Sequence, residues 1–418
     1  MMQVMLTEMQ ASVKPKTGVD MLYFIAVLCL LAFLLFFFSP TDPPPLKGVY
    51  ARPGGWFFLK FILFKVLIWI RKRAAFATTA GYGAQSSKDE AKMDAVHPLI
   101  DHALAVDASY FNGYNDQGFY FGAGVQRRPN GRVESLLLLR VPELGILEWT
   151  FAPNTDTHEI QPLTYSAQPG LQLIPEIPMK KWRVLLDAEL KLKQDPNRRF
   201  KVKLDLIWTA TSPYFDFDSD LSENLLAKAI AVEAWSSEFF NRLKRSHQSH
   251  QEQFGELRGR LSIDNYLDNQ DFRLHSMKDH SFGGYRNWAD FHRYILHYLA
   301  TNDGRTYLAL HFVSMPGVLM SHLVCGFVAS SNHKSTVISC NKALWQIGEN
   351  GTPPDSYNFV VETEAGSMYT VEIEKVDLTT FYCGWQKEAQ INSYLCHCSI
   401  NGVPGRGMCE FEYRNVNK

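Results

Sequence analysis

An uncharged apolar stretch at residues 21–38 constrains this chain more than any other feature of its sequence. Its 18 residues would form a helix of about 27 Å, close to the thickness of the hydrocarbon layer of a bilayer. A cleaved signal peptide is the alternative, but its apolar part is usually shorter, about 7–15 residues, and residues 39–45 are a poor cleavage site. We therefore expect a retained transmembrane helix at residues 21–39, after an N-terminal tail at residues 1–20.

A second apolar stretch at residues 54–73 contains two lysines and ends in a basic cluster at residues 71–73. In a helix, Trp56 and Trp69 would lie only about 20 Å apart, which is short for a membrane span. Tryptophans near both ends and lysines that can snorkel are typical of an amphipathic helix lying in the membrane interface. A short second span is the alternative.

Positive charge is distributed unevenly around the first apolar stretch. Two lysines precede it, whereas seven Lys and Arg residues follow it before residue 74. The positive-inside rule therefore predicts that the large domain after residue 73 lies in the cytosol, with one span or with two. We expect the protein in the endoplasmic reticulum or another endomembrane. The seven cysteines, an odd number without framework spacing, agree with a reducing compartment.

Charge balance and missing motifs exclude several classes of protein. Lys and Arg number 42 against 43 Asp and Glu, and a net charge of −1 argues against a partner that is a nucleic acid. The sequence contains neither a P-loop nor a dinucleotide fingerprint, so we expect no cofactor. Cys396 and Cys398 flank His397, but no second pair of ligands lies near them in sequence, and we expect no metal.

Most of the chain after residue 96 consists of short apolar or alternating segments separated by turn signals, which is typical of antiparallel strands. Residues 182–190 and 200–208 form one such pair, and Asn401-Gly402 predicts a hairpin turn. No alternation of strands with helices is present. We expect a mainly β protein with two tandem antiparallel barrels or sandwiches, at residues 96–220 and 251–418.

Two other segments organise the predicted β units. Residues 74–95 are small and polar, which is typical of a linker. Residues 221–250 carry apolar side chains at steps of four and three, so we expect one long connecting helix, with Asp220 or Ser222 as its N-cap.

Residues 279–294 concentrate the side chains that could carry chemistry. In a turn next to glycines, Asp279 and His280 could both point into a cavity mouth, where the carboxylate would tune the imidazole for proton transfer. Nearby aromatic rings could stabilise a cation-like transition state. The alternative is a buried polar cluster, with Asp279 paired to Arg286 and His280 bonded to backbone. The catalytic candidates are Asp279, His280, Arg286 and Trp288, and the ligand-binding candidates are Tyr285, His292, Tyr294 and Trp385.

The motif Lys278-Asp279-His280-Ser281-Phe282-Gly283-x-x-Arg286-x-Trp288, together with residues 250–259, resembles an uncharacterised lipocalin-like domain. That domain is related to the carotenoid 1,2-hydratase (hydroxyneurosporene synthase) and tocopherol-cyclase-like superfamily. The chain also resembles the N-terminal region of invertebrate phosphoenolpyruvate-synthase-like proteins. Lys278 departs from the arginine that usually precedes the aspartate. The sequence also lacks the dikinase-like region of the second group, so we expect none of its ATP and phosphohistidine chemistry.

The resemblance implies two lipocalin-like barrels in tandem and an apolar cavity for a lipid or isoprenoid. It also implies cofactor-free protonation of a carbon–carbon double bond, with Asp279 and His280 as the acid and base. Three functions stay open: a membrane-anchored hydratase, cyclase or isomerase, a non-catalytic lipid carrier or sensor, and an accessory subunit that binds a protein partner. A shared fold alone does not distinguish between these three functions.

Overall fold

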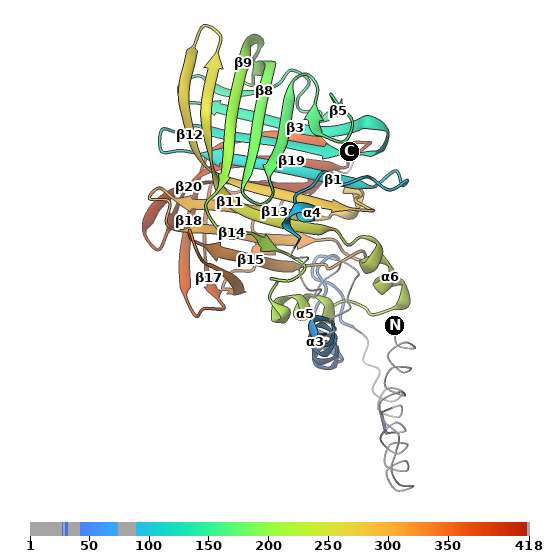
Figure 1. The fold of residues 1–418 in the computed structure, drawn as a ribbon. Coiled ribbons are helices and arrows are strands. Elements are labelled where there is room, and N and C mark those ends of the chain that lie inside the picture. The colour runs from blue at the N-terminus through green and yellow to red at the C-terminus, as the bar shows by residue number, and fades with distance from the viewer. Residues whose placement is uncertain (1–26, 28–29, 32–41, 74–88, 416–418) are drawn as a thin grey trace.

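Two antiparallel sheets account for most of the chain (Figure 1). The computed structural model describes residues 27, 30–31, 42–73 and 89–415. One sheet has 12 strands, and eight further strands form a closed barrel. The predicted mainly β class is confirmed.

Strands β1 to β12 form the first sheet. Their bounds are β1 (Val106–Tyr114), β2 (Tyr120–Arg127), β3 (Arg132–Val141), β4 (Gly145–Trp149), β5 (Asp156–His158), β6 (Tyr165–Ala167), β7 (Leu171–Ile177), β8 (Lys181–Leu192), β9 (Asp195–Ala210), β10 (Phe215–Asp216), β11 (Ser249–Ile263) and β12 (Leu267–Gly283). The predicted strand pair at residues 182–190 and 200–208 is β8 and β9, in which Trp182 lies opposite Trp208.

The first sheet closes on itself. Because β9 pairs with β8 on one side and with β11 on the other, eight strands form a ring in the order β11, β12, β1, β2, β3, β4, β8 and β9. Alternate side chains along each strand point into this ring. Inside this ring of strands, the aromatic side chain of Phe111 lies 5.5 Å from that of Trp182 and 6.0 Å from that of Trp208, measured between ring centroids.

Strands β13 to β20 form the closed barrel: β13 (Arg293–Thr301), β14 (Tyr307–Ser314), β15 (Leu323–Ala329), β16 (Lys334–Cys340), β17 (Ser356–Thr363), β18 (Met368–Cys383), β19 (Ala389–Ile400) and β20 (Val403–Arg414). Its interior holds a buried cluster that includes Ile295, Phe359 and Phe411. The predicted Asn401-Gly402 turn joins β19 to β20, and both residues have positive φ (52° and 77°), which asparagine and glycine tolerate.

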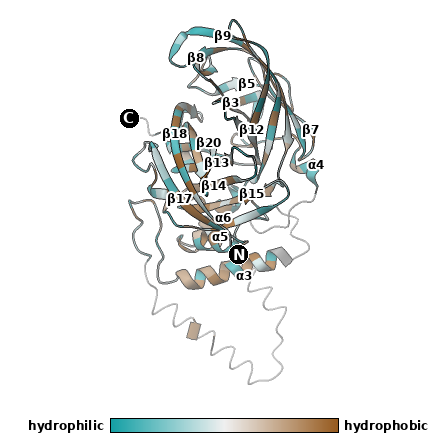
Figure 2. Cartoon of the chain, turned by 90° about the vertical axis from the view of Figure 1, so that its left-hand side faces the viewer, coloured by the Kyte–Doolittle hydropathy of each residue, from teal (hydrophilic) through white to brown (hydrophobic). Residues whose placement is uncertain are grey.

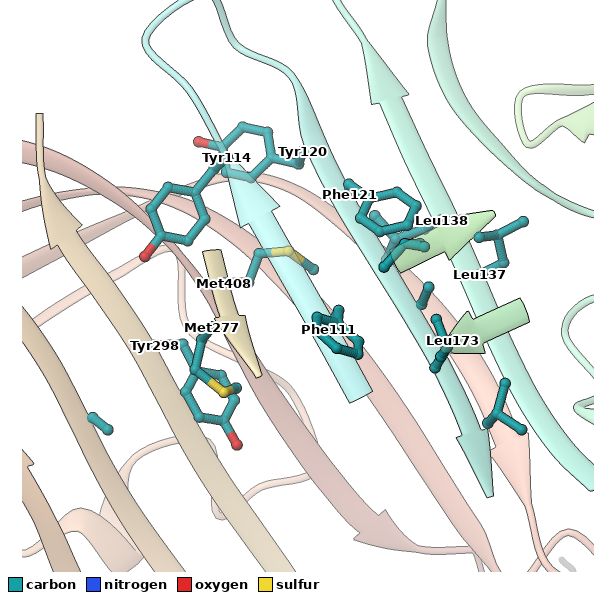
Figure 3. Packing of buried hydrophobic residues seen from close by; sticks show 14 of the residues in the cluster. Phe111, Tyr114, Tyr120, Phe121, Leu137, Leu138, Leu173, Met277, Tyr298 and Met408 are labelled. Carbon is teal, nitrogen blue, oxygen red and sulfur yellow. The ribbon is translucent and has the colours of Figure 1, made fainter. Parts of the chain in front are cut away.

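A third group of buried side chains lies between the two sheets. Because neighbouring residues of a strand point to opposite faces, each sheet also presents an outer face, and the two outer faces pack together. Figure 3 shows Met277 of β12 and Tyr298 of β13 in this packed region, with Met408 of β20 near them. All three are fully buried.

The pairing of β11 and β12 changes the predicted domain boundary. Residues 251–283 were expected in the second β unit, but β11 pairs with β9 and β12 pairs with β1, both in the first sheet. The chain therefore passes to the second barrel after β12, through the short 3-10 helix Trp288–Asp290.

The predicted long helix at residues 221–250 is instead two short helices, α5 (Glu223–Ala231) and α6 (Ser237–Arg245), followed by the start of β11. The backbone of Ser236 is extended and its hydroxyl accepts a hydrogen bond from Phe239 N at 3.0 Å, so Ser236 begins a new helix. The predicted N-cap Ser222 is confirmed, since its hydroxyl accepts a bond from Leu225 N.

The second apolar stretch forms the helix α3 (Phe57–Arg73), which packs on α5. Lys60 and Lys65 do not snorkel as expected, because Lys60 Nζ donates to Glu233 O at 2.9 Å and Lys65 Nζ donates to Asn224 Oδ1 at 2.9 Å. No helix within the described residues is both long and apolar enough to cross a bilayer. The span predicted at residues 21–39 lies outside the described residues, except for residues 27, 30 and 31.

The end of the predicted linker docks onto the first sheet. Residues 74–88 lie outside the described part, whereas residues 90–93 form the short helix α4 (Glu90–Met93). Asp94 then accepts hydrogen bonds from Trp182 Nε1 at 2.7 Å and from Lys278 Nζ at 2.5 Å, and all three side chains are buried.

Candidate functional site

A cavity of about 280 Å³ lies between the outer faces of the two sheets. Strands β1, β2, β3, β11 and β12 line it from the first sheet, and β13, β14, β15, β19 and β20 line it from the second. Most of its wall is apolar and includes Leu136, Phe217, Leu296, Val313, Leu323 and Ile391.

Titratable side chains gather along β11 and β12. On the register of these strands, Asp279 lies opposite Glu252 of β11 and opposite Tyr110 of β1, and His250 lies opposite Ser281. Residues directly opposite each other in an antiparallel pair point to the same face. The pairing therefore brings Asp279, Glu252 and His250 together in the cavity wall.

Glu252 is the centre of this group and is fully buried. Its Oε1 lies 3.1 Å from His250 Nε2 and accepts a hydrogen bond from the Tyr298 hydroxyl at 3.2 Å. Its Oε2 lies 2.9 Å from His311 Nε2, on β14 of the second barrel. His250 also faces Asp279, with Nδ1 and Oδ1 3.5 Å apart. The network thus joins side chains of both sheets.

The pKa values of the two carboxyl groups of the network are shifted in opposite directions. Burial alone would raise the pKa of Glu252, but the charge of His311 and the hydrogen bonds from both histidines outweigh it and lower that pKa well below its usual range. Burial raises the pKa of Asp279 against the attraction of His250. Burial would lower the pKa of His250, yet the nearby carboxylates raise it. Two titratable groups whose pKa values are pushed apart in one site are a common basis for acid–base chemistry.

Glu410 of β20 supplies another acid on the opposite wall. Burial and the charge of Asp279 raise its pKa to about 7. The Tyr294 hydroxyl donates to Glu410 Oε2 at 3.2 Å. Near neutral pH, Glu410 can therefore either give or take a proton.

Arg286 and Trp288 line the same cavity but do not contact Asp279 through any hydrogen bond or ion pair in the described residues. Arg286 donates to Gln248 Oε1 at 2.8 Å and to Gln126 Oε1 at 2.8 Å. The Trp288 indole donates to Glu134 Oε2 at 2.7 Å. The Asp279–Arg286 pair of the alternative interpretation is therefore absent, and Arg286 is held by neutral partners.

His280 lies on the other side of the sheet from Asp279. The sequence suggested a turn here, but Asp279 and His280 are successive residues of β12, so their side chains point to opposite faces. His280 is fully buried inside the ring of strands formed by the first sheet. Its Nδ1 lies 2.9 Å from Met93 O, and its Nε2 lies 3.0 Å from Asp107 Oδ1 and 2.8 Å from the Tyr165 hydroxyl. The expected Asp279–His280 pair does not form, and His280 belongs to a buried polar cluster.

Of the four predicted ligand-binding residues, Tyr294 lines the cavity and three lie outside it. Tyr285 stacks under the Arg245 guanidinium, 4.9 Å from its ring centroid. His292 packs edge-on against Tyr50, and Trp385 is 57% exposed with Arg132 over its ring.

Sequence reasoning missed Glu252, His250, His311 and Glu410. His250 and Glu252 are two residues apart, which places them on one face of a strand, and this spacing was visible in the sequence. His311 and Glu410 belong to the second barrel, and no local pattern links them to β11.

One cluster in the described residues could be considered for a metal ion: His250, Glu252 and Asp279, whose ligand atoms lie within 4.8 Å of one another. The imidazole turns Nε2 to Glu252 and Nδ1 to Asp279, so the two carboxylates approach different nitrogens of one ring. A shared ion would need both carboxylates on the side of one nitrogen. The arrangement fits a proton relay better than a metal site.

Comparison with known proteins places the fold. The model of a protein family described as a family of unknown function (DUF8627) matches residues 23–413. No curated protein matches the sequence. A Nitrosomonas europaea protein described as AttH is 11% identical, with a TM-score of 0.53 over 81% of this chain and 100% of that chain, so the two share a fold. Kievitone hydratase from Nectria haematococca is 10% identical, with a TM-score of 0.44 over 76% of this chain and 91% of its own. These matches give no support to the resemblance to phosphoenolpyruvate-synthase-like proteins.

Proposed function

We propose that this chain, which belongs to the DUF8627 family, binds a small apolar molecule between its two sheets and protonates one of its carbon–carbon double bonds. It would act as a cofactor-free hydratase, cyclase or isomerase. The observation that carries this proposal is a single apolar cavity lined by three acids whose pKa values are shifted apart: that of Glu252 is lowered, whereas those of Asp279 and Glu410 are raised. Pairs of groups whose surroundings push their pKa values apart often divide acid and base roles.

The cavity restricts the size and polarity of the ligand. Its volume of about 280 Å³ is just below the roughly 300–1,000 Å³ typical of ligand pockets. This favours a short terpenoid or a fused-ring molecule over a long carotenoid chain. The apolar wall favours the hydrocarbon part, and no lysine lines the cavity in the described part of the chain.

The residues suggest a simple proton path. Glu410 would give its proton to one carbon of the double bond, which leaves the positive charge on the other carbon. Water or a second double bond of the same molecule would then bond to the cationic carbon, and the proton released would return to the Glu410 carboxylate. The negative charge of Glu252 and the rings of Tyr294 and Tyr298 would stabilise the cation.

Asp279 and His250 would support this path in either of two ways. Asp279 could act as the donor for a molecule bound nearer to β12, because burial raises its pKa and so favours its acid form relative to an exposed aspartate. His250 lies between Asp279 and Glu252 and could move protons between them. Replacing Asp279 and Glu410 separately therefore distinguishes the two donors.

The test uses the full chain and farnesol as a probe in heavy water. If the double bond is protonated, deuterium should appear on former olefinic carbons of the recovered product, as measured by mass spectrometry and NMR. Glu410→Gln or Asp279→Asn should lower the rate by about 10²–10⁴-fold, the usual contribution of a general acid. Glu148→Gln is the matched control, since Glu148 is also buried in the first sheet but does not line the cavity.

Binding of farnesol without deuterium uptake would refute the catalytic proposal for this probe and favour a lipid carrier. In that case Glu410→Gln should change affinity rather than chemistry. A carrier uses the same apolar wall, so both functions predict that a bulky substitution such as Leu296→Trp reduces binding.

A further inference from the structure

The helix α3 has an unusual distribution of polarity. The side that faces solvent is made of seven large apolar side chains: Phe58, Leu59, Ile62, Leu63, Val66, Trp69 and Ile70. Phe58 is 69% exposed and Trp69 is 52% exposed. These positions recur at steps of three and four, so they form one continuous stripe along the helix. Surface helices of soluble domains normally place polar residues on this side.

Two lysines of α3, Lys60 and Lys65, are turned inward, toward the rest of the molecule. Lys60 and Lys65 donate to Glu233 O and Asn224 Oδ1, at the two ends of α5. Phe64 and Ile68 are 8% and 2% exposed and belong to the large buried cluster. The helix is therefore held in a fixed rotation by both polar and apolar contacts, and its apolar stripe points outward. Figure 2 shows α3 at the edge of the molecule beside α5, brown over much of its length.

We propose that the exposed apolar stripe of α3 docks onto the surface of a lipid bilayer that contains anionic headgroups. The helix sequence has five Lys and Arg residues and no acid, and three of the five close its C-terminal end. Cations beside an inserted apolar stripe attract anionic lipids. The uncharged stretch at residues 21–38 precedes α3 in the same chain, and its composition suits the same lipid partner.

This orientation would bring one wall of the cavity to the membrane surface. Glu233, whose carbonyl binds Lys60 of α3, accepts a hydrogen bond from Ser321 N through its Oε1 at 2.7 Å. The neighbouring residues Leu319 and Met320 line the cavity and share the buried cluster with Phe64 and Ile68. An apolar ligand leaving the bilayer would therefore meet this wall first. The docking itself does not depend on the proposed chemistry.

The experiment uses the full chain reconstituted into vesicles of phosphatidylcholine and phosphatidylserine that carry a diazirine on an acyl chain. After illumination, mass spectrometry locates the crosslinks. We expect labels on Ile62, Leu63 and Val66 and several-fold fewer on Phe64 and Ile68, because only the first three face outward. This contrast between neighbouring residues tests the rotation of α3 and is not produced by the stretch at residues 21–38.

A paired variant extends the test. Ile62→Glu with Val66→Glu places two charges in the stripe and should lower the labelling of α3 by at least about tenfold. Met368→Glu is the matched control, because Met368 is 65% exposed on β18 of the second barrel, and its labelling pattern should be that of the unchanged chain. If the paired variant does not fold, the labelling pattern of α3 in the unchanged chain still tests the proposed docking.

Three results would overturn the proposal. The first is no label on α3 while residues 21–38 are labelled. The second is equal labelling of the two sides of α3, because the helix would then have left α5. The third is protection of α3 from labelling that increases with protein concentration, in parallel with dimer formation measured by sedimentation. That result would assign the stripe to contact with a second copy of the chain. None of these results depends on deuterium uptake, so failure of the docking and failure of the proposed chemistry are distinguishable.

Discussion

Replacing His280 by glutamine should destabilise the chain, whereas replacing its neighbour Asp279 by asparagine should not. His280 is fully buried and uses both imidazole nitrogens, toward Met93 O and Asp107 Oδ1. A glutamine can restore only part of these contacts, and each buried group left without a bond costs about 1–3 kcal/mol. We expect a loss of about 2–4 kcal/mol. At roughly 2–4 °C per kcal/mol, the thermal midpoint should fall by roughly 4–16 °C.

Asp279 faces the cavity, and its charged form is already disfavoured there. Burial raises the pKa of Asp279, so a neutral amide of the same shape removes a desolvation cost while it keeps the packing. His250 loses one carboxylate neighbour but keeps Glu252. We expect the free energy of unfolding to change by less than about 1 kcal/mol.

Thermal unfolding of the full chain followed by circular dichroism, in one buffer at pH 7, measures both effects. The same samples are then assayed for deuterium uptake by farnesol, which Asp279→Asn should reduce and a folded His280→Gln should retain. A silent His280→Gln together with a strong loss for Asp279→Asn would refute the assignment of the two side chains to opposite faces of β12. Equal losses would also contradict it, because that result fits a single mixed cluster.

Three further predictions concern other parts of the molecule. Burial raises the pKa of Glu410 from 4.5 to about 7, so its contribution to stability is complete below pH 4.5 and is lost as the pH rises through about 7. The free energy of unfolding, measured with urea, should therefore fall by about 3 kcal/mol over this range, and it should fall less in Glu410→Gln. Adding Zn²⁺ or EDTA should leave the thermal midpoint unchanged, because the two nitrogens of His250 face different carboxylates. A rise of several degrees in the midpoint with Zn²⁺ would instead favour a metal site. Ser236→Ala should cost about 1 kcal/mol in urea unfolding by removing the N-cap of α6, and no change would contradict that role.

The sequence predicted those parts of the fold that depend on local pattern. The alternation in residues 200–208 identified β9, and Asn401-Gly402 identified a hairpin because few other residue pairs tolerate two positive φ angles. Residues 221–250 were predicted as one helix because the apolar spacing continues across Ser236. A hydroxyl that caps a new helix does not interrupt that spacing, so periodicity alone could not reveal the break.

The candidate site was predicted in part. Asp279, Arg286, Trp288 and Tyr294 all line the cavity, as expected of site residues, but His280 does not. The error came from taking the segment around Asp279 and His280 as a turn, since in a turn two neighbouring side chains can point the same way. In a strand they cannot. The aromatic and glycine residues of the motif hid the strand, because they interrupt the usual alternation of apolar and polar residues.

The position of the cavity explains why its acids could not be identified one by one. Each barrel has its interior occupied by buried side chains, such as Phe111 with Trp182 in the first and Ile295 with Phe411 in the second. The cavity lies outside both barrels, so its polar residues occupy the outer faces of strands, where carboxylates and histidines are ordinary surface residues in an isolated barrel. Packing of the second barrel removes Glu252 and Asp279 from water and adds His311 and Glu410. The opposite pKa shifts of these acids are therefore a property of the tandem arrangement, and either β unit alone would have acids of ordinary pKa at these positions.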